Sequence, residues 1–273
     1  MSDKAVTYIS YLKIDELLDL QQPLSDGEHD EMLFIVIHQT YELWFKQILH
    51  EVGALQPALE AGDTHRSLAL LGRIRTIMKT CVAQIDILET MTPLQFNSFR
   101  GRLSSSSGFQ SAQFRELEAV LGRRDHAGAS ADKSSGMGMA EHLIEGSPAR
   151  LRVEAAMNRA SVWDSALRYF DSRGWAMPAE VLGRDVSVGY QDHVGVQDVL
   201  VEMHRQDPEA GMVAEALLDV DEGLQEWRYR HVKMVERTIG RKPGTGGSAG
   251  VGYLASTLFH PVFADLWAIR SRL

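Results

Sequence analysis

The chain has 273 residues, of which 44% are hydrophobic and 24% charged, as is ordinary for a soluble globular protein. Its formal net charge of −9 argues against a nucleic-acid partner, because phosphate binding needs a basic surface, and to a lesser degree against an anionic membrane surface. Cys81 is the only cysteine, which excludes an intrachain disulfide, a zinc site built from several cysteines and a CxxCH haem attachment.

Export and membrane insertion have no support in the sequence. The N-terminal residues MSDKAVTYIS lack the basic segment followed by an apolar stretch that marks a signal peptide. The longest purely apolar run, MLFIVI, is much shorter than the roughly 20 residues that a membrane-spanning helix needs. We therefore expect a reduced, cytoplasmic protein.

The first strong helical pattern begins after residue 24. Ser25 to Glu28 have the form of a capping box, which predicts a long helix from there towards Glu60. An apolar stripe of this helix also carries a histidine, because residues at i, i+4, i+7 and i+11 share one face. The residues of this stripe are Phe34, His38, Tyr41 and Phe45.

A second helix is expected to begin at a cap formed by Asp63 or Thr64. Its apolar residues alternate steps of three and four, which is typical of a helix packed in a bundle. They are Leu71, Ile74, Met78, Cys81, Ile85 and Leu88. Cys81 therefore lies on a buried seam, where an inert packing thiol is expected rather than a reactive one.

Threonine, proline and glutamine at positions 92, 93 and 95 signal the start of a short helix through Arg100. Ser104 to Gly108 should end it, and the helical pattern resumes from Phe109 to Leu121. Residues 122–139 are rich in glycine, serine and charge, so we expect a flexible surface loop, with a lid over a site as an alternative.

Helical patterns return in the second half of the chain, at Ala149 to Asp171, Val196 to Arg205 and Met212 to Ile239, and again before Leu273. One stripe of the third segment is formed by Leu224, Trp227, His231, Val235 and Thr238. No long segment alternates with a period of two residues, and no internal repeat is visible. These patterns predict an all-α fold in a single domain of residues 1–273.

The glycine-rich run from Gly244 to Gly250 is not a phosphate-binding loop, because it lacks the Gly-Lys-Ser/Thr ending. It also follows a helix rather than a strand, which removes the context of a dinucleotide fingerprint. Two interpretations stay open: a plain flexible loop, or backbone N–H groups with the Thr245 and Ser248 hydroxyls around an anionic group.

His38 and His231 are also open to two interpretations, since a histidine on an apolar stripe is often a hydrogen-bonded core residue. Basic residues surround His231 in sequence and either attract an acidic ligand or form a solvated face: Arg228, Arg230, Lys233 and Arg237. HExxH and nucleophile motifs are absent. Two core-facing histidines in an all-helical protein suit a non-covalently bound haem with one histidine as axial ligand.

Several blocks strongly resemble the tryptophan 2,3-dioxygenase family and occur in the family's order. They are HDEMLFIVIHQTYELWFKQILHE, LETMTPLQFNSFR, SSGFQSAQFRELE, WRYRHVKMVERTIG and GTGGSAGVGYL, with YISYLKIDELLDLQQPLS similar to the family's N-terminal arm. These blocks span the chain from end to end, but none falls between Gly122 and about Leu217.

The resemblance implies an all-helical, cytoplasmic homotetramer that binds haem b (iron protoporphyrin IX). It implies that both atoms of the co-substrate O2 are inserted across the indole C2–C3 bond of L-tryptophan, giving N-formylkynurenine. His231 matches the proximal iron ligand, and His38 matches the distal histidine that contacts the indole N–H. Arg100 matches the arginine that binds the substrate carboxylate, a task suited to the bidentate guanidinium group.

Further site residues follow from the same resemblance. Phe34, Phe96 and Leu103 match the indole pocket. Ser107 matches a polar residue near haem and substrate, and Thr245 matches the threonine that meets the substrate ammonium group.

The arm, residues 1–24, is implied to complete the pocket of a neighbouring subunit through Tyr8, Tyr11 and Leu12. Ile9 replaces the usual glycine, Ala249 replaces a serine, and no proline occurs near position 105. These differences leave one alternative within the family: oxygenation of a substituted tryptophan, such as a β-methyl derivative, with one oxygen inserted to give an oxindole. A rival from another class is a haem-binding sensor or a helical interaction module.

Overall fold

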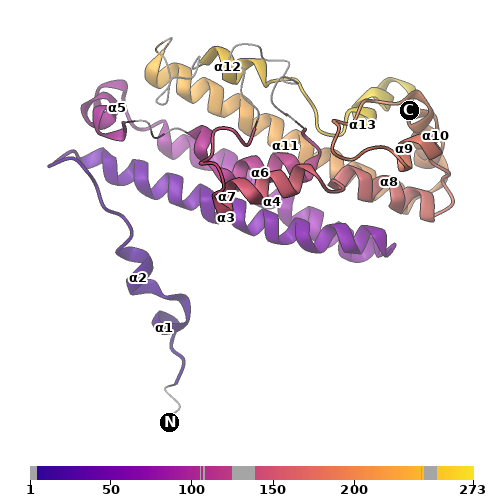
Figure 1. The fold of residues 1–273 in the computed structure, drawn as a ribbon, viewed down its shortest axis with the longest axis horizontal. Coiled ribbons are helices and arrows are strands. Elements are labelled where there is room, and N and C mark those ends of the chain that lie inside the picture. Colours follow the sequence, from indigo (N-terminus) through magenta and orange to yellow (C-terminus); the bar gives the residue numbers. More distant parts are fainter. Residues whose placement is uncertain (1–4, 105, 107, 125–138, 241, 243–250) are drawn as a thin grey trace.

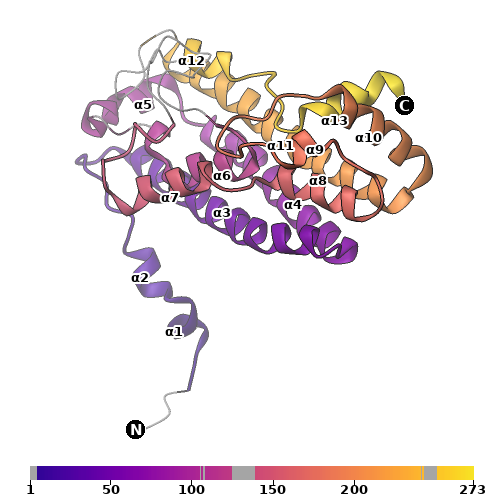
Figure 2. The ribbon, with the colours of Figure 1, turned by 45° about the vertical axis from the view of Figure 1, so that its right-hand side comes forward.

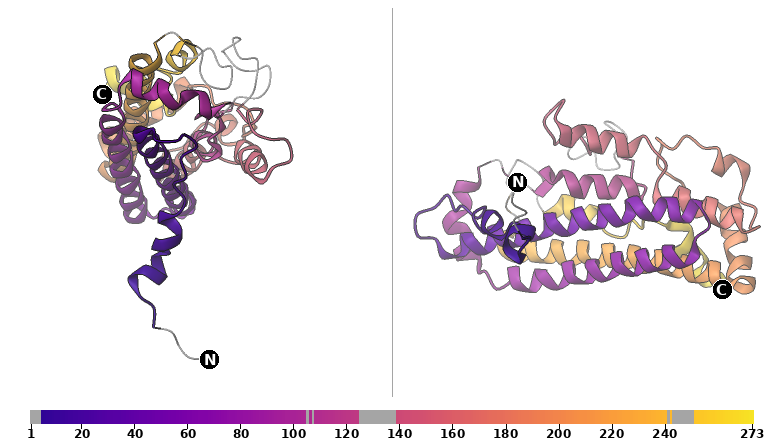
Figure 3. Two further views of the ribbon diagram at one scale, coloured as in Figure 1. Left: turned by 90° about the vertical axis from the view of Figure 1, so that its left-hand side faces the viewer. Right: turned by 90° about the horizontal axis from the view of Figure 1, so that it is seen from below.

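Every regular element of the described chain is a helix, as predicted (Figure 1). The computed structural model describes residues 5–104, 106, 108–124, 139–240, 242 and 251–273. Three long helices form the centre: α3 (His29–Glu60), α4 (Thr64–Leu88) and α11 (Pro208–Ile239). α4 packs against both α3 and α11, and the view from below shows all three running side by side (Figure 3).

Shorter helices cover the long ones. α6 (Ala112–Leu121) packs against α3 and α7 (Pro148–Met157), and α8 (Val162–Ser172) also packs against α3. One end of the bundle carries α9 (Ala179–Leu182), α10 (Val194–Gln206), α13 (Ala264–Ala268) and a 3₁₀ turn, Ile269–Arg272. The other end carries α5 (Pro93–Arg100) and α12 (Val251–Ser256), with 3₁₀ turns at Gly101–Leu103 and Gly108–Gln110 (Figure 2).

The N-terminal arm stands apart from this body. α1 (Tyr8–Leu12) and α2 (Ile14–Leu18) project away from the bundle in both side views (Figure 1, Figure 2). Neither short helix contains a buried residue. No helix in the described part of the chain is both long and apolar enough to span a membrane.

Two predicted helix starts are confirmed by side-chain caps. The Asp63 carboxylate accepts a hydrogen bond from the Arg66 backbone N–H at 3.0 Å and begins α4. Thr92 and Gln95 form the predicted reciprocal capping box, with a proline at the first position of α5.

The predicted start of α3 is wrong by several residues. Glu28 is the N-cap and forms no side-chain cap, whereas the Ser25 hydroxyl donates to the Glu31 carboxylate instead of capping a backbone N–H. The backbone N–H groups of Leu24 and Ser25 also donate to Glu31, at 2.9 and 2.8 Å. Ser25, the first residue of the capping-box pattern, therefore stabilises a turn that precedes the helix instead of capping the helix itself.

The segment predicted as one helix from Ala149 to Asp171 is two helices. α7 ends at Met157, and α8 starts at Val162 behind a buried capping box in which Ser161 and Asp164 bond reciprocally. Asp164 also pairs with Arg184 at 2.8 Å, which ties the break to a distant loop. These polar side chains impose the break between the two helices. The sequence pattern did not reveal it, because apolar residues continue on both sides.

Two later helix boundaries also differ from the predicted ones. α11 starts at Pro208, one turn before the predicted Met212, because Asp207 caps it. The expected final helix is interrupted between α12 and α13, where Phe259 has a φ of 61°. Of the predicted loop at residues 122–139, positions 125–138 lie outside the described residues.

The C-terminal segment is fastened to α11 by one buried carboxylate. Asp221 accepts backbone N–H bonds from Val262 at 2.9 Å and Phe263 at 3.0 Å, and the Trp267 indole N–H at 3.0 Å. Cys81 on α4 is fully buried, and burial raises the pKa of its thiol to about 12, as expected for an inert packing residue.

Replacing Ser161 by alanine should lower the free energy of unfolding by ~0.5–2 kcal/mol, because the cap of α8 is lost. Urea unfolding followed by circular dichroism measures this. Ser172→Ala is the matched control, since Ser172 is an exposed residue at the other end of α8. An equal effect of both substitutions would contradict a capping role for Ser161.

Candidate active site: a cavity between two histidines

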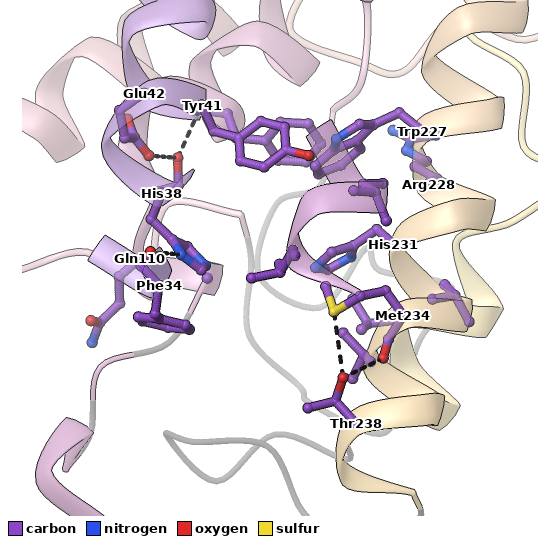
Figure 4. Close-up of a pocket in the computed structure, with 18 of the residues that line it drawn as sticks. Phe34, His38, Tyr41, Glu42, Gln110, Trp227, Arg228, His231, Met234 and Thr238 are labelled. Carbon is purple, nitrogen blue, oxygen red and sulfur yellow. Dashed lines mark hydrogen bonds between the residues drawn. The ribbon is translucent and has the colours of Figure 1, made fainter. Parts of the chain in front are cut away.

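A cavity of about 530 Å³ lies between α3 and α11, at the end of the bundle that carries α5 and α12 (Figure 4). Its volume is within the range of ~300–1,000 Å³ found for small-molecule sites. The whole predicted stripe of α3 lines it: Phe34, His38, Tyr41 and Phe45. Most of the remaining wall is apolar, which is the usual composition of a ligand pocket.

His38 and His231 enter this cavity from opposite walls, and their rings point towards one another (Figure 4). The Nδ1 atom of His38 lies 2.7 Å from the backbone carbonyl oxygen of Phe34. Because a carbonyl can only accept, Nδ1 carries the proton in neutral His38. Nε2 is then the ring atom with a free lone pair, able to accept a hydrogen bond from a ligand.

The surroundings lower the pKa of both imidazoles, which favours their neutral form. Burial lowers the pKa of His38, against the opposing effects of the Phe34 carbonyl and the Glu42 carboxylate. Burial, followed by the nearby His38 and Arg115, lowers the pKa of His231 to about 4. A neutral imidazole is the form that ligates metals, so His231 can offer a nitrogen lone pair to an iron centre at neutral pH.

Aromatic rings form two groups around these histidines. Near His38, the ring centroid of Phe34 lies 4.0 Å from the imidazole and 5.8 Å from Phe96. Near His231, Trp227 lies parallel to the imidazole, with centroids 5.2 Å apart and an interplanar angle of 3°. A flat planar ligand between the two histidines therefore has apolar contacts on both sides.

A buried ionic cluster borders the cavity beside α6. The Glu118 carboxylate binds Arg115 at 2.6 Å, Arg123 at 2.9 Å and Arg228 at 2.8 Å. Burial alone raises the pKa of Glu118, but the three guanidinium groups outweigh it and lower that pKa to about 2. The Arg228 pair joins α11 to α6 less than one turn from His231.

The other basic residues around His231 in sequence point elsewhere. Arg230 pairs with Asp86 at 2.5 Å, and Lys233 pairs with Glu236 at 2.9 Å. Arg237 lies 3.7 Å from Glu89. These residues form the solvated face that was one of the two open interpretations, and only Arg228 lines the cavity.

The structure brings six of the site residues from the sequence analysis to one cavity: Phe34, His38, Phe96, Arg100, Leu103 and His231. Arg100 is half-buried at the end of α5, on the side of the cavity formed by Phe34 and Phe96. Ser107 and Thr245 lie outside the described residues.

The arm residues do not reach the cavity of their own chain. Tyr8 and Tyr11 are 73% and 74% exposed, and Leu12 is 43% exposed, on a helix that projects from the body.

Sequence reasoning missed several wall residues. Glu42, one turn after His38, accepts hydrogen bonds from Ser111 and Gln113. Its i+4 spacing from His38 was visible in the sequence, but it could equally have marked a solvated position. The pairing of Glu118 with Arg228, 110 residues away along the chain, had no local signal.

Comparisons with known proteins agree with this geometry. A family model described as tryptophan 2,3-dioxygenase matches residues 1–135 and 198–273. This chain belongs to the tryptophan 2,3-dioxygenase family. A tryptophan 2,3-dioxygenase of Herpetosiphon aurantiacus is 55% identical over 271 residues, or 99% of both chains.

Two further tryptophan 2,3-dioxygenases are similar to this chain. The protein of Anaeromyxobacter dehalogenans is 55% identical, with 98% of this chain and 97% of the relative covered. The protein of Caulobacter vibrioides is 43% identical, with 98% of each covered. The middle segment, which carried no family motif, is therefore shared with tryptophan 2,3-dioxygenases as well.

Glu118→Gln should lower the free energy of unfolding at neutral pH by ~3–5 kcal/mol, because three arginines lose a buried counter-charge. The folded-state pKa of Glu118 is depressed, so its contribution is present above pH 4.5 and is lost as the pH falls towards 2. Urea titrations across this pH range should give a flatter pH dependence for Glu118→Gln than for wild type.

Glu116→Gln provides the control on the same helix, since Glu116 forms a more exposed pair with Arg152 at 3.3 Å. That substitution should change the free energy of unfolding by less than ~1 kcal/mol. Parallel pH profiles for wild type and Glu118→Gln would contradict the role given to the cluster.

Proposed function

We propose that this protein is a haem-dependent dioxygenase that inserts O2 across the C2–C3 bond of the indole ring of L-tryptophan, giving N-formylkynurenine. The observation that carries the proposal is the pair of imidazoles facing one another across an aromatic cavity that Arg100 also lines. The activity named for relatives of 43–55% identity supports it.

The residues around His231 fit a haem b group. His231 offers a nitrogen donor with a lowered pKa inside a cavity whose walls are largely apolar, and it would ligate the haem iron. When bound, the haem supplies the chemistry that activates O2, while the protein supplies binding, orientation and exclusion of water. Ser107 is proposed to lie near the haem.

His38 is assigned to the distal side, where it contacts the substrate. Its Nδ1 proton is committed to the Phe34 carbonyl, so Nε2 can accept a hydrogen bond from the indole N–H. A lowered pKa keeps this acceptor unprotonated at neutral pH. This arrangement makes His38 an orienting group for the indole rather than a strong base.

The remaining substrate contacts divide into apolar and polar ones. Phe34, Phe96 and Leu103 are proposed to hold the indole ring; all three line the cavity, which supports this role. Arg100 is proposed to bind the carboxylate by a bidentate pair, and Thr245 to bind the ammonium group.

We propose a cytoplasmic homotetramer in which residues 1–273 form one domain and residues 1–24 form an exchanged arm. Tyr8, Tyr11 and Leu12 expose apolar surface that a five-residue helix cannot bury by itself. We propose that a neighbouring copy of the chain binds this surface, and that the three side chains complete the cavity of that copy.

The protein expressed with haem should convert L-tryptophan to a product heavier by two oxygen atoms, and mass spectrometry with ¹⁸O₂ measures this. His231→Ala should lose the Soret band of the ligated haem. A product with one added oxygen would overturn the dioxygenase assignment. An unchanged haem spectrum in His231→Ala would overturn the ligand assignment.

Arg100→Gln should reduce kcat/KM for L-tryptophan by ~30- to 1,000-fold, as a charge-assisted pair in a closed site is worth ~2–4 kcal/mol. Tryptamine, which lacks the carboxylate, should be a poor substrate of wild type and lose little in the variant. Arg102→Gln is the control, since Arg102 is exposed on the adjacent turn. Equal use of tryptamine and tryptophan by wild type would assign Arg100 another role.

A further inference from the structure

The two cavity histidines are fixed in different ways. His38 is oriented by the hydrogen bond from Nδ1 to the carbonyl of Phe34, four residues earlier on α3. The imidazole of His231 forms no hydrogen bond with any described residue, although a carbonyl four residues earlier on α11 is available to it in principle. Metal-ligating histidines are usually held by a hydrogen bond from their second ring nitrogen.

The side chain four residues before His231 is Trp227, on the same face of α11. Its indole lies parallel to the imidazole, with an interplanar angle of 3° and centroids 5.2 Å apart (Figure 4). Rotation of the imidazole about its Cβ–Cγ bond would drive it out of this parallel contact. The indole therefore restricts the one torsion that sets the plane of the ring.

Trp227 is itself immobilised by rings from two other helices. Tyr41 and Phe45 of α3 both lie 6.1 Å from it edge-on, and Phe114 of α6 lies 4.9 Å from it. Only 9% of Trp227 is exposed. The packed bundle thus fixes the position of Trp227, and Trp227 in turn restrains the orientation of the His231 imidazole.

No carboxylate among the described cavity residues is placed to do this work instead. Glu118, a buried acid paired with Arg228 of α11, also binds Arg115 and Arg123. Glu42 belongs to the opposite wall and binds Ser111.

We infer that Trp227 is a positioning residue for the haem ligand, in which ring stacking on His231 replaces the usual hydrogen bond of a metal-bound histidine. This inference rests on the proposed function, because it takes His231 as the axial ligand. The parallel stacking of the flat indole on the imidazole, with an interplanar angle of 3°, is the contact that carries this role.

The test compares substitutions that keep or remove a flat ring in the haem-loaded, full-length protein. Trp227→Phe keeps one, whereas Trp227→Met and Trp227→Leu fill the space with flexible apolar chains; two such variants guard against a folding failure of either. Trp163→Leu is the control, since Trp163 is 1% exposed and packs against Tyr190 and Phe263 away from the cavity.

Two readouts are independent of activity: the iron–histidine stretching band of the ferrous protein in resonance Raman spectra, and the rate of haem transfer to apomyoglobin. In the Met and Leu variants the band should broaden or shift, and haem transfer should accelerate ~10- to 100-fold, the scale for outer-sphere partners of metal ligands. Trp227→Phe should stay near wild type in both. Trp163→Leu should lower Tm without changing the band.

An unchanged band and transfer rate in Trp227→Met or Trp227→Leu would overturn the inference, as would equal changes in the Phe variant and the aliphatic variants. His231→Ala separates this failure from that of the proposed function. If His231→Ala keeps the wild-type haem spectrum, the ligand assignment fails; if it loses that spectrum while the Trp227 variants behave like wild type, only the positioning role fails.

Discussion

Both histidine-bearing helices pack against α4, and this shared contact sets the width of the cavity across which the two imidazoles face each other. His38 lies on a helix of 32 residues and His231 on another of the same length, so neither depends on a loop for its position. Sites on long packed helices hold their geometry more tightly than sites on loops. The cavity thus follows from the packing of the bundle, because α4 sets the distance between α3 and α11.

The electrostatics of the cavity follow from the same packing. Desolvation in the cavity lowers the pKa of both histidines, and Glu118 neutralises part of the charge of three arginines that would otherwise repel one another beside α6. A largely apolar chamber with neutral imidazoles on both sides favours an uncharged, flat aromatic group over an ion. Arg100 comes from α5 at the other end of the chamber, so a ligand with one indole and one carboxylate matches the distribution of polarity.

The all-α fold and the core of the site were predictable because helical periodicity and family motifs are local in sequence. The stripe from Phe34 to Phe45 lines the cavity as a unit, and the capping signal at Thr92 started a helix where predicted. Failures occurred where polar side chains have partners other than those that the local pattern suggests. Ser25 binds Glu31 instead of capping a helix, and the Ser161 cap is reinforced by Arg184. The parallel stacking of Trp227 on His231 depends on side-chain torsions that spacing alone does not define.

Asp221 binds the C-terminal segment back onto α11 and so closes a loop in the chain. The chain leaves this helix at Ile239 and is bound to it again at Val262 and Phe263, so both ends of the intervening stretch are anchored to one rigid rod. For a closed loop, doubling the length costs only ~0.6 kcal/mol of closure entropy. A change in the length of chain between Ile239 and Val262 would therefore cost little, while Leu254 and Thr257 line the cavity. The Asp221 contacts thus hold this part of the cavity wall to the same helix that carries His231.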